Sequence, residues 1–419
     1  MAFGWQSEAN IISILASDFW LLTSFFLSLL VTRHSSHDSH RPLRLLMAAG
    51  GTGGHVIPAL VIAREFCARN PAATVLFVGT PRGIEARLVP EAGFALELLE
   101  VGALQGQSAS IRLKTLLALP RALWQALRIL ERFHPHVVLG VGGYAAGPVM
   151  LTAAWSGIPL AVLEPNAYPG LVNRWVAPYV SRAFVGFPEA AAFFPPNQVV
   201  EAGIPVRREF FAVPPKPHQP PCTVLVFGGS QGARALNRAV VEALPQLDQF
   251  KETLLLLHQT GQTEYNAIRE AYAKHSVRAE VSPYIEAMPE AFARSDLVVC
   301  RAGASTVGEL TAAGRAAILV PYPAAANRHQ LRNAESLAAR GAARVILDRE
   351  LNGERLVATI RELLGDPAKL ERMETAMRRA AHPEAAARIV EEIERLAQVV
   401  VGRLGGVHAH GVLPGRGRE

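Results

Sequence analysis

Short apolar runs alternate with longer stretches of helical character through most of this chain. Runs of this length and composition, separated by helices, are typical of buried parallel strands in βαβ units. The first set comprises Arg44–Ala49, Thr74–Gly79, Phe94–Leu99, Val137–Gly140, Leu160–Leu163, Ala183–Val185 and Val199–Glu201. The second set comprises Thr223–Phe227, Thr253–His258, Arg278–Val281, Leu297–Cys300, Ala317–Val320 and Arg344–Ile346. The pattern therefore predicts two parallel α/β sheets.

The two sets of strands are separated by the proline-rich stretch Val213–Pro221. Proline at this density fits neither a helix nor a central strand, so the stretch predicts a linker or exposed loop near a domain boundary. We expect an N-terminal domain over residues 43–206 and a C-terminal domain over 207–382, followed by a helix over 383–401. The remaining residues 402–419, rich in Gly, Arg and His, predict a disordered tail.

Residues 1–42 differ from the rest, because Ile11–Val31 is an apolar stretch near the ~20 residues that cross a bilayer. Asp18 in its middle argues against a spanning helix, and Glu8 argues against a signal peptide. Three interpretations stay open: a membrane anchor, an interfacial helix, or a start codon placed upstream of the true one. The arginines that follow the stretch would leave the body of the protein in the cytoplasm in each case.

Charge and cysteine content narrow the class of protein. The formal net charge of +6 favours an acidic partner, which could be an anionic membrane surface, nucleic acid or a phosphorylated substrate. Cys67, Cys222 and Cys300 lie far apart and form no CxxC pair, so the chain predicts neither a disulfide framework nor a zinc site.

Three glycine-rich turns follow predicted strands and precede predicted helices: Gly50–His55, Gly142–Pro148 and Gly228–Ala233. A turn of this kind lets backbone N–H groups face an anion. The first turn continues to Val56 where the dinucleotide fingerprint needs glycine or alanine, and the chain has no GxxxxGK[ST] loop. The remaining hypothesis is a pair of anion-binding turns that face one cleft and serve a donor and an acceptor, each carrying a diphosphate.

Six segments resemble, in order, the motifs of the MurG family of N-acetylglucosaminyltransferases. They are Gly50–His55, Gly142–Pro148, Glu164–Asn166, Phe227–Asn237, Arg301–Glu309 and Pro321–Glu335. The resemblance covers residues 44–398 and implies the GT-B fold, two Rossmann-like parallel-sheet domains around a cleft, to which this chain adds the apolar N-terminal extension. It also implies that the last helix returns to pack on the N-terminal domain.

The activity that the resemblance implies is an inverting transfer of N-acetylglucosamine from UDP-N-acetylglucosamine to undecaprenyl-pyrophosphoryl-N-acetylmuramyl-pentapeptide, which converts lipid I to lipid II in peptidoglycan biosynthesis. It implies an enzyme without cofactor or metal, at the cytoplasmic face of the bacterial plasma membrane, held peripherally or by its N-terminus. The implied partners are the two substrates, the anionic membrane surface and other cell-wall synthesis proteins, with no nucleic acid.

Carried over residue by residue, the family's donor contacts fall on both domains. Glu309 would accept hydrogen bonds from the ribose hydroxyls, the amides of Ala304–Thr306 would bind the α-phosphate, and Ser230 would bind the diphosphate. The backbone of Ile285 would read uracil, while Asn166 and Gln330 would contact the sugar. The full predicted donor site is Thr52, Gly53, Gly54, Asn166, Arg207, Ser230, Ile285, Ala304, Ser305, Thr306, Val307, Gly308, Glu309 and Gln330.

Two residues compete for the role of general base. His55 begins a predicted helix, whose dipole would favour the neutral imidazole that can accept a proton. Glu164 is the rival, because a carboxylate at the carboxyl end of a strand commonly faces the cleft. Here the family's His-Glu-Gln-Asn becomes Leu163-Glu164-Pro165-Asn166, and its paired glutamines become His329-Gln330.

The acceptor pyrophosphate is expected at Gly142, Gly143, Tyr144 and Gly147 by the same resemblance. Nearby, Ile111–Phe133 combines leucines and Trp124 with arginines, a pattern that suits an anionic membrane surface but also a core helix. Trp155 lies in the corresponding neighbouring segment. Three rival functions stay open: a related glycolipid synthase acting on diacylglycerol, a sugar-nucleotide epimerase, and a non-catalytic membrane scaffold that binds UDP-sugar.

Overall fold

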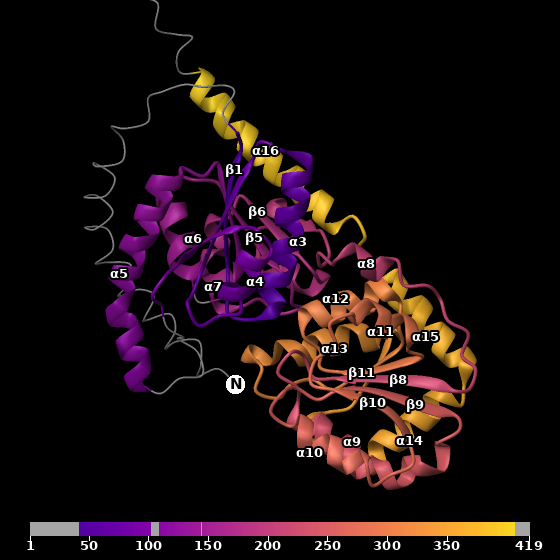
Figure 1. Ribbon diagram of the computed structural model, residues 1–419. Helices are drawn as coiled ribbons and strands as arrows, with labels where there is room; N and C mark the ends of the chain where they lie inside the picture. The colour runs from indigo at the N-terminus through magenta and orange to yellow at the C-terminus, as the bar shows by residue number, and fades with distance from the viewer. Residues whose placement is uncertain (1–41, 102–108, 144, 407–419) are drawn as a thin grey trace, which may run out of the picture.

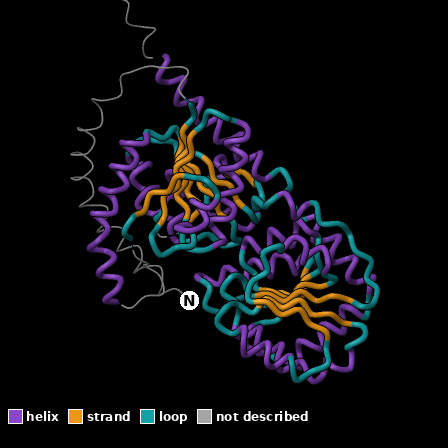
Figure 2. Tube along the Cα trace, viewed as in Figure 1, coloured by secondary structure: helices purple, strands orange, loops and turns teal. Residues whose placement is uncertain are grey.

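The computed structural model describes residues 42–101, 109–143 and 145–406. The predictions for residues 1–41, for Tyr144 and for 407–419 lie outside the described residues. Two parallel sheets, each covered by helices on both faces, form two lobes (Figures 1 and 2). Both sheets have the doubly wound topology, so the predicted GT-B fold is confirmed.

The N-terminal lobe contains a sheet of seven strands in the order β3-β2-β1-β4-β5-β6-β7. Its strands are β1 Arg44–Ala49, β2 Thr74–Gly79, β3 Ala95–Leu98, β4 Val137–Gly142, β5 Leu160–Glu164, β6 Arg182–Val185 and β7 Val199–Glu201. Its helices are α3 Gly53–Arg69, α4 Glu85–Glu91, α5 Ala109–Phe133, α6 Ala146–Trp155 and α7 Leu171–Val176, and α8 Arg208–Phe211 follows at the lobe crossing.

The C-terminal lobe contains a sheet of six strands in the order β10-β9-β8-β11-β12-β13. Its strands are β8 Cys222–Phe227, β9 Leu254–Gln259, β10 Arg278–Ser282, β11 Leu297–Cys300, β12 Ala317–Leu319 and β13 Ala343–Val345. Its helices are α9 Arg234–Leu247, α10 Tyr265–Tyr272, α11 Met288–Arg294, α12 Ala304–Ala313, α13 His329–Ala339, α14 Gly353–Leu364 and α15 Pro367–Arg379. The predicted runs of both sets form strands whose ends differ from the prediction by at most two residues.

Alternation along each central strand places its side chains in two cores. In β1, Leu45 and Met47 pack on one face of the sheet, whereas Leu46 and Ala48 pack on the other. All of these side chains are fully buried. A strand that is buried on both faces of a parallel sheet needs apolar residues at successive positions, which explains the continuous apolar run in the sequence.

The last helix, α16 Ala385–Gly406, leaves the C-terminal lobe and lies along α3 of the N-terminal lobe (Figure 1). Ile389, Val390 and Ile393 are buried in the same core cluster as β1 and α3. Glu394 also binds Arg69, with 2.9 Å between Oε2 and a guanidinium nitrogen. The helix continues through residues 402–406, where the sequence had predicted the start of a disordered tail.

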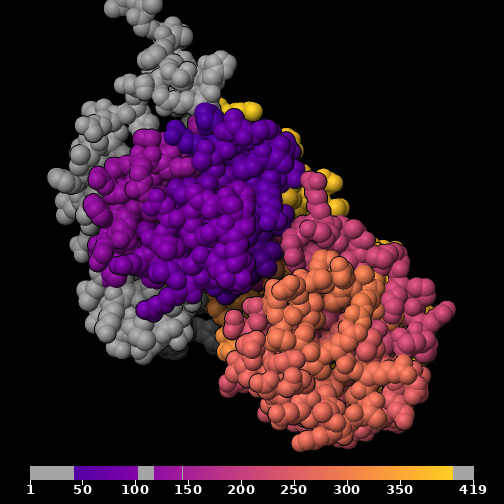
Figure 3. Space-filling model, viewed as in Figure 1, coloured from indigo at the N-terminus to yellow at the C-terminus, as the bar shows by residue number. Residues whose placement is uncertain are grey.

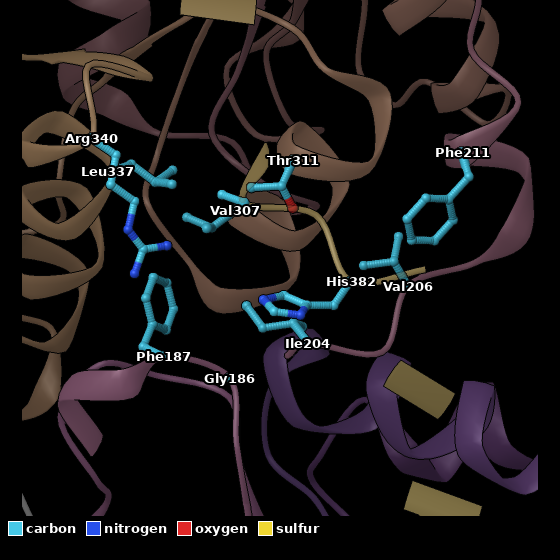
Figure 4. A pocket seen from close by; sticks show the side chains of 11 residues that line it. Gly186, Phe187, Ile204, Val206, Phe211, Val307, Thr311, Leu337, Arg340 and His382 are labelled. Atoms are coloured by element: carbon cyan, nitrogen blue, oxygen red, sulfur yellow. The ribbon is translucent and has the colours of Figure 1, made fainter. Parts of the chain in front are cut away.

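The chain crosses between the lobes twice, before α8 and before α16, and both crossings border one small pocket (Figure 4). Ile204 and Val206 of the first crossing and His382 of the second line this pocket together with Val307 and Thr311 of α12. A side chain at Gly203 would place its Cβ within 2.2 Å of the His382 ring. The two crossings therefore pack on each other.

Among the residues that the structure describes, we find no helix with the length and hydropathy needed to cross a bilayer.

Candidate functional site

In both sheets the strand order reverses at the first strand, between β1 and β4 and between β8 and β11. Ligands of open α/β sheets bind at the carboxyl ends of strands beside such a reversal. The predicted glycine turns follow β1, β4 and β8, and the turn at Gly303 follows β11. The lobes meet along this side of the molecule, and Figure 3 shows them in contact as two rounded bodies.

The turns after β1 and β4 pack directly on each other. The Gly50 N–H donates to the Gly142 carbonyl oxygen at 3.1 Å. Gly142 and Gly143 have φ values of +117° and +93°, and a Cβ at Gly143 would lie 2.2 Å from the Gly50 oxygen. These two positions of the predicted acceptor site therefore require glycine for backbone approach and conformation. Gly147 is the second residue of α6.

His55 lies in the first turn of α3, over the β4 turn. A Cβ at Gly142 would come within 2.9 Å of its ring, and Thr52 Oγ1 lies 3.4 Å from Nδ1. Burial of the ring, assisted by His329 of the other lobe, lowers the pKa of His55 to about 4. The imidazole is therefore neutral at pH 7. The sequence had predicted this state, but desolvation rather than the helix dipole is the main cause.

Glu164, the rival base, is 1% exposed and accepts four hydrogen bonds. Oε1 accepts from the main-chain and side-chain nitrogens of Asn166 at 3.0 and 3.1 Å, and Oε2 accepts from Gly170 N and Asn173 Nδ2 at 2.9 Å each. Burial raises the pKa of this carboxyl. The arrangement favours a role in holding residues 164–173 together over proton transfer.

Asn166, predicted to contact the donor sugar, bonds to the opposite lobe. Its Oδ1 accepts from Asn333 Nδ2 at 3.1 Å, and Asn333 Oδ1 accepts from Ala167 N at 2.8 Å. Asn333 is completely buried and also donates to the Ala302 oxygen at 3.1 Å. Since Ala302 precedes α12, Asn333 links the loop after β5 to the turn after β11.

A second contact between the lobes joins the two helix starts. Ser305 Oγ donates to the Gly53 oxygen at 3.2 Å. Gly53 and Gly54 begin α3, while Ala304, Ser305 and Thr306 begin α12 behind the extended N-cap Gly303. The first residues of a helix leave N–H groups without helical partners, so these amides of α12 can bind an anion.

The other two predicted contacts in this helix have structural roles. Val307 N donates to the Gly303 oxygen at 2.9 Å, and its side chain is 1% exposed. A Cβ at Gly308 would lie 2.8 Å from Val206, so glycine here permits α12 to pack closely on the lobe crossing. The Val307 side chain lines the pocket at the two lobe crossings.

Glu309 and Arg207 form an ion pair beside the start of α12. The guanidinium lies 3.1 Å from Glu309 Oε1, and the glutamate is 9% exposed. Burial outweighs the attraction of Arg207 and raises the pKa of Glu309 to about 6. The carboxylate is therefore largely ionised at pH 7 and can accept two hydroxyl hydrogen bonds.

The remaining predicted donor residues line the C-terminal lobe. Ser230 is exposed in the turn after β8, between Gly229 and Gly232, whose φ values are +89° and +76°. The Ile285 N–H donates to Gln259 Oε1 at 2.8 Å, so a contact of the Ile285 backbone with a ligand would have to use its carbonyl. Gln330 Oε1 accepts from Tyr322 N at 3.0 Å, and His329 Nδ1 lies 2.7 Å from the Ala326 oxygen.

Sequence reasoning missed three residues that hold these loops. They are Asn333, Gln259, whose Nε2 also donates to the Gly229 oxygen at 2.9 Å, and Glu85, whose carboxylate accepts from Gly51 N at 2.8 Å. Asn333 lies in the motif Pro321–Glu335 and Gln259 directly follows the predicted strand Thr253–His258, so the available signal was a polar residue inside or beside a recognised segment. Glu85 carried no signal, because only the tertiary fold brings it to the first glycine turn.

The glycosyltransferase family 28 N-terminal domain matches residues 45–185, and the C-terminal domain of the same family matches residues 223–389. A UDP-N-acetylglucosamine--N-acetylmuramyl-(pentapeptide) pyrophosphoryl-undecaprenol N-acetylglucosamine transferase of Anaeromyxobacter dehalogenans (strain 2CP-C) is 48% identical over 352 residues, 83% of this chain and 92% of that protein. The transferase of the same name from Anaeromyxobacter sp. (strain Fw109-5) is 46% identical over 90% of this chain and 98% of its own length.

Solved structures agree with the sequence relatives. The crystal structure of Acinetobacter baumannii MurG is similar with a TM-score of 0.70 and 32% identity, over 84% of this chain and all of that chain. A UDP-GlcNAc 2-epimerase from Neisseria meningitidis has a TM-score of 0.61 over 84% of this chain and all of its own, but at 12% identity it shows a common fold alone. The chain therefore belongs to the MurG family of N-acetylglucosaminyltransferases.

Proposed function

We propose that this protein transfers N-acetylglucosamine from UDP-N-acetylglucosamine to undecaprenyl-pyrophosphoryl-N-acetylmuramyl-pentapeptide, forming lipid II. The observation that carries the proposal is the identity of 46–48% with transferases of that name over nearly their full length. The meeting of two glycine-rich switch points across the junction between the lobes agrees with a donor and an acceptor that each carry a diphosphate.

The donor site in this proposal lies on the C-terminal lobe. The amides of Ala304, Ser305 and Thr306 bind the α-phosphate, and Glu309 accepts hydrogen bonds from the ribose. Arg207, which already neutralises Glu309 at 3.1 Å, supplies a positive charge close to the leaving diphosphate. These oriented donors stabilise the charge that grows on UDP as the glycosidic bond breaks.

His55 is the general base of the proposed reaction. The acceptor hydroxyl attacks the anomeric carbon of the donor on the face opposite UDP, its proton passes to the neutral imidazole, and the bond to UDP breaks with inversion. An imidazole whose pKa is about 4 is a weak base. A bound diphosphate beside it raises that pKa towards neutrality, where a base acts best.

The acceptor is a lipid, so the protein must contact a membrane surface. Trp124 on α5 is 58% exposed, and the Arg128 guanidinium lies 5.6 Å from its ring centre. The opposite face of this helix, which includes Ala126 and Leu130, is buried against the sheet. We infer that the exposed face of α5 is the peripheral contact with an anionic membrane at the cytoplasmic side.

Labelled UDP-N-acetylglucosamine with lipid I tests the proposal, with diacylglycerol as the competing acceptor. A labelled disaccharide attached to the lipid diphosphate is expected, and His55→Ala should lower its rate of formation by roughly a hundredfold or more. Product on diacylglycerol would identify a glycolipid synthase, and conversion of the donor without acceptor would identify an epimerase. Donor binding without any turnover would identify a scaffold.

A further inference from the structure

A buried carboxylate that the proposed reaction does not use lies behind the first glycine turn. Glu85, the first residue of α4, is 0% exposed. Its Oε1 accepts from Thr80 N at 2.8 Å and Thr80 Oγ1 at 2.9 Å, and its Oε2 accepts from Gly51 N at 2.8 Å. The carboxylate thus ties the loop after β2 to the turn after β1.

Glycines enclose this carboxylate. A Cβ at Gly50, Gly79 or Gly83 would lie 2.5, 2.4 or 1.9 Å from an atom of the Glu85 side chain. The glycine at position 50 is therefore explained by Glu85 and not by the approach of a phosphate. The Gly51 N–H, on a residue with φ +89°, is bonded to Glu85 and is not available to a phosphate.

The same turn holds His55. The imidazole forms a hydrogen bond with the main chain of Gly50. The next residue, Gly51, donates its N–H to the Glu85 carboxylate. Among the described residues, the titratable groups that act on His55 are Glu85 from α4 and His329 from α13. Burial and His329 lower the pKa of His55, whereas the bond to Gly50 and, to a smaller extent, the negative charge of Glu85 raise it.

We propose that Glu85 is a positioning residue for the transfer reaction, which fixes the Gly50–Gly51 turn on which the His55 ring rests and stabilises the imidazolium. The inference rests on the proposed function, because it takes His55 to be the base. It adds Glu85 to the residues of the proposed reaction as a group that does not touch the substrates.

The chemistry of the step balances without any further reactant. The acceptor O–H bond breaks as an N–H bond forms on His55, and the acceptor oxygen bonds to the anomeric carbon as the bond to UDP breaks. UDP takes the electron pair of that bond, and the positive charge appears on the imidazole. Glu85 then faces a cation across the Gly50–Gly51 turn instead of a neutral ring, so its charge favours the state after proton transfer.

The test compares Glu85→Gln with Glu91→Gln, an exposed glutamate on the same helix α4 that pairs with Arg87 at 3.3 Å. The protonated fraction of His55 is measured at pH 5 by NMR of histidine-labelled protein with excess UDP, and its signal is assigned by its loss in His55→Gln. We expect E85Q to lower that fraction and to decrease kcat roughly tenfold or more. The acid limb of the profile of kcat against pH should move to lower pH, because the base has a lower pKa. E91Q should behave as the wild type in all three measurements.

Thr80→Val separates bonding from charge, because it removes one hydrogen bond to Glu85 and keeps the carboxylate. It should lower the melting temperature and leave the protonation of His55 unchanged. If E85Q loses activity and stability but leaves the protonated fraction of His55 at the wild-type value, Glu85 is merely structural and the inference is wrong. If protonation shifts but the acid limb does not follow it, the coupling stands and the role of His55 as base fails instead.

A second variant keeps the test decisive if E85Q does not fold. Glu85→Asp retains the charge and withdraws it from Gly51 by one methylene. We expect a partial decrease in His55 protonation together with a lower kcat. A decrease in kcat with wild-type protonation would contradict the electrostatic part of the inference.

Discussion

The proline-rich segment that leads from the lobe crossing to β8 is held to the C-terminal lobe by a buried histidine. His218 Nδ1 lies 3.0 Å from Asp296 Oδ1, and Nε2 lies 3.6 Å from Glu374 Oε1. The histidine side chain is 2% exposed, and Lys216 also pairs with Asp296. We predict that replacing His218 by glutamine removes a pH-dependent part of the stability of this lobe.

The size of the effect follows from the pKa of the imidazole. The hydrogen bond to Asp296 and the nearby carboxylate of Glu374 raise the pKa of His218 from 6.5 to about 9. A rise of this size corresponds to about 3 kcal/mol in favour of the protonated folded state. Because the folded pKa lies above the unfolded one, this contribution is fully present below pH 6.5. It is lost as the pH rises through 9.

Urea unfolding of wild type and His218→Gln between pH 6 and pH 10 measures this contribution. We expect a difference in unfolding free energy of up to about 3 kcal/mol at pH 6 that shrinks as the pH approaches 10. Gln219→Ala is the matched control, because Gln219 is exposed in the same segment, and it should follow the wild-type curve. A difference that is constant with pH, or that grows in alkali, would refute the reasoning.

Four further predictions concern the site and the membrane contact. Glu309→Ala should raise the KM for the donor about tenfold or more, because charged hydrogen bonds to the ribose are lost. In the wild type, donor affinity should fall as the pH drops through about 6, where this carboxyl is protonated. Asn333→Ala should raise the KM and lower the melting temperature together, since it leaves the Ala167 N–H without its acceptor at 2.8 Å. Trp124→Ser should weaken binding to vesicles that contain anionic lipid while turnover of a short-chain acceptor stays unchanged.

Each of these predictions has an outcome that contradicts it. Unchanged donor kinetics would remove Glu309 from the ribose site, and a donor affinity that improves in acid would reverse the sign argued from its pKa. An Asn333 variant with wild-type stability would show that its two hydrogen bonds across the lobes are energetically unimportant. Equal vesicle binding by Trp124→Ser would move the membrane contact away from the exposed face of α5.

The strands were predictable because burial on both faces of a parallel sheet imposes continuous apolar runs. Arg44–Ala49 and Leu297–Cys300 are such runs, and both form strands with the predicted ends. Helix ends were less predictable. α3 begins at Gly53 rather than at His55, because the Thr52 carbonyl accepts from both His55 N and Val56 N.

The site was predictable as a set of loops but not as a set of contacts. The motifs placed Glu309 after β11 and Arg207 at the lobe crossing, whereas their 3.1 Å ion pair depends on how the lobe crossing packs on α12. Asn166 shows the same limit, because its partner Asn333 is 167 residues away in sequence. Spacing along the chain carries no information about pairs that only the docking of two lobes brings together.

The return of α16 to the N-terminal lobe has a consequence for biosynthesis. Ile389, Val390 and Ile393 complete the core around β1, yet they are synthesised after the whole C-terminal lobe. The N-terminal lobe therefore leaves the ribosome first and keeps part of its apolar surface exposed until α16 has been synthesised. The C-terminal lobe can fold without any later segment. A nascent chain arrested before Ala385 should consequently contain a native C-terminal lobe and an unfinished N-terminal lobe, which makes chaperone binding during translation strongest at the amino-terminal half.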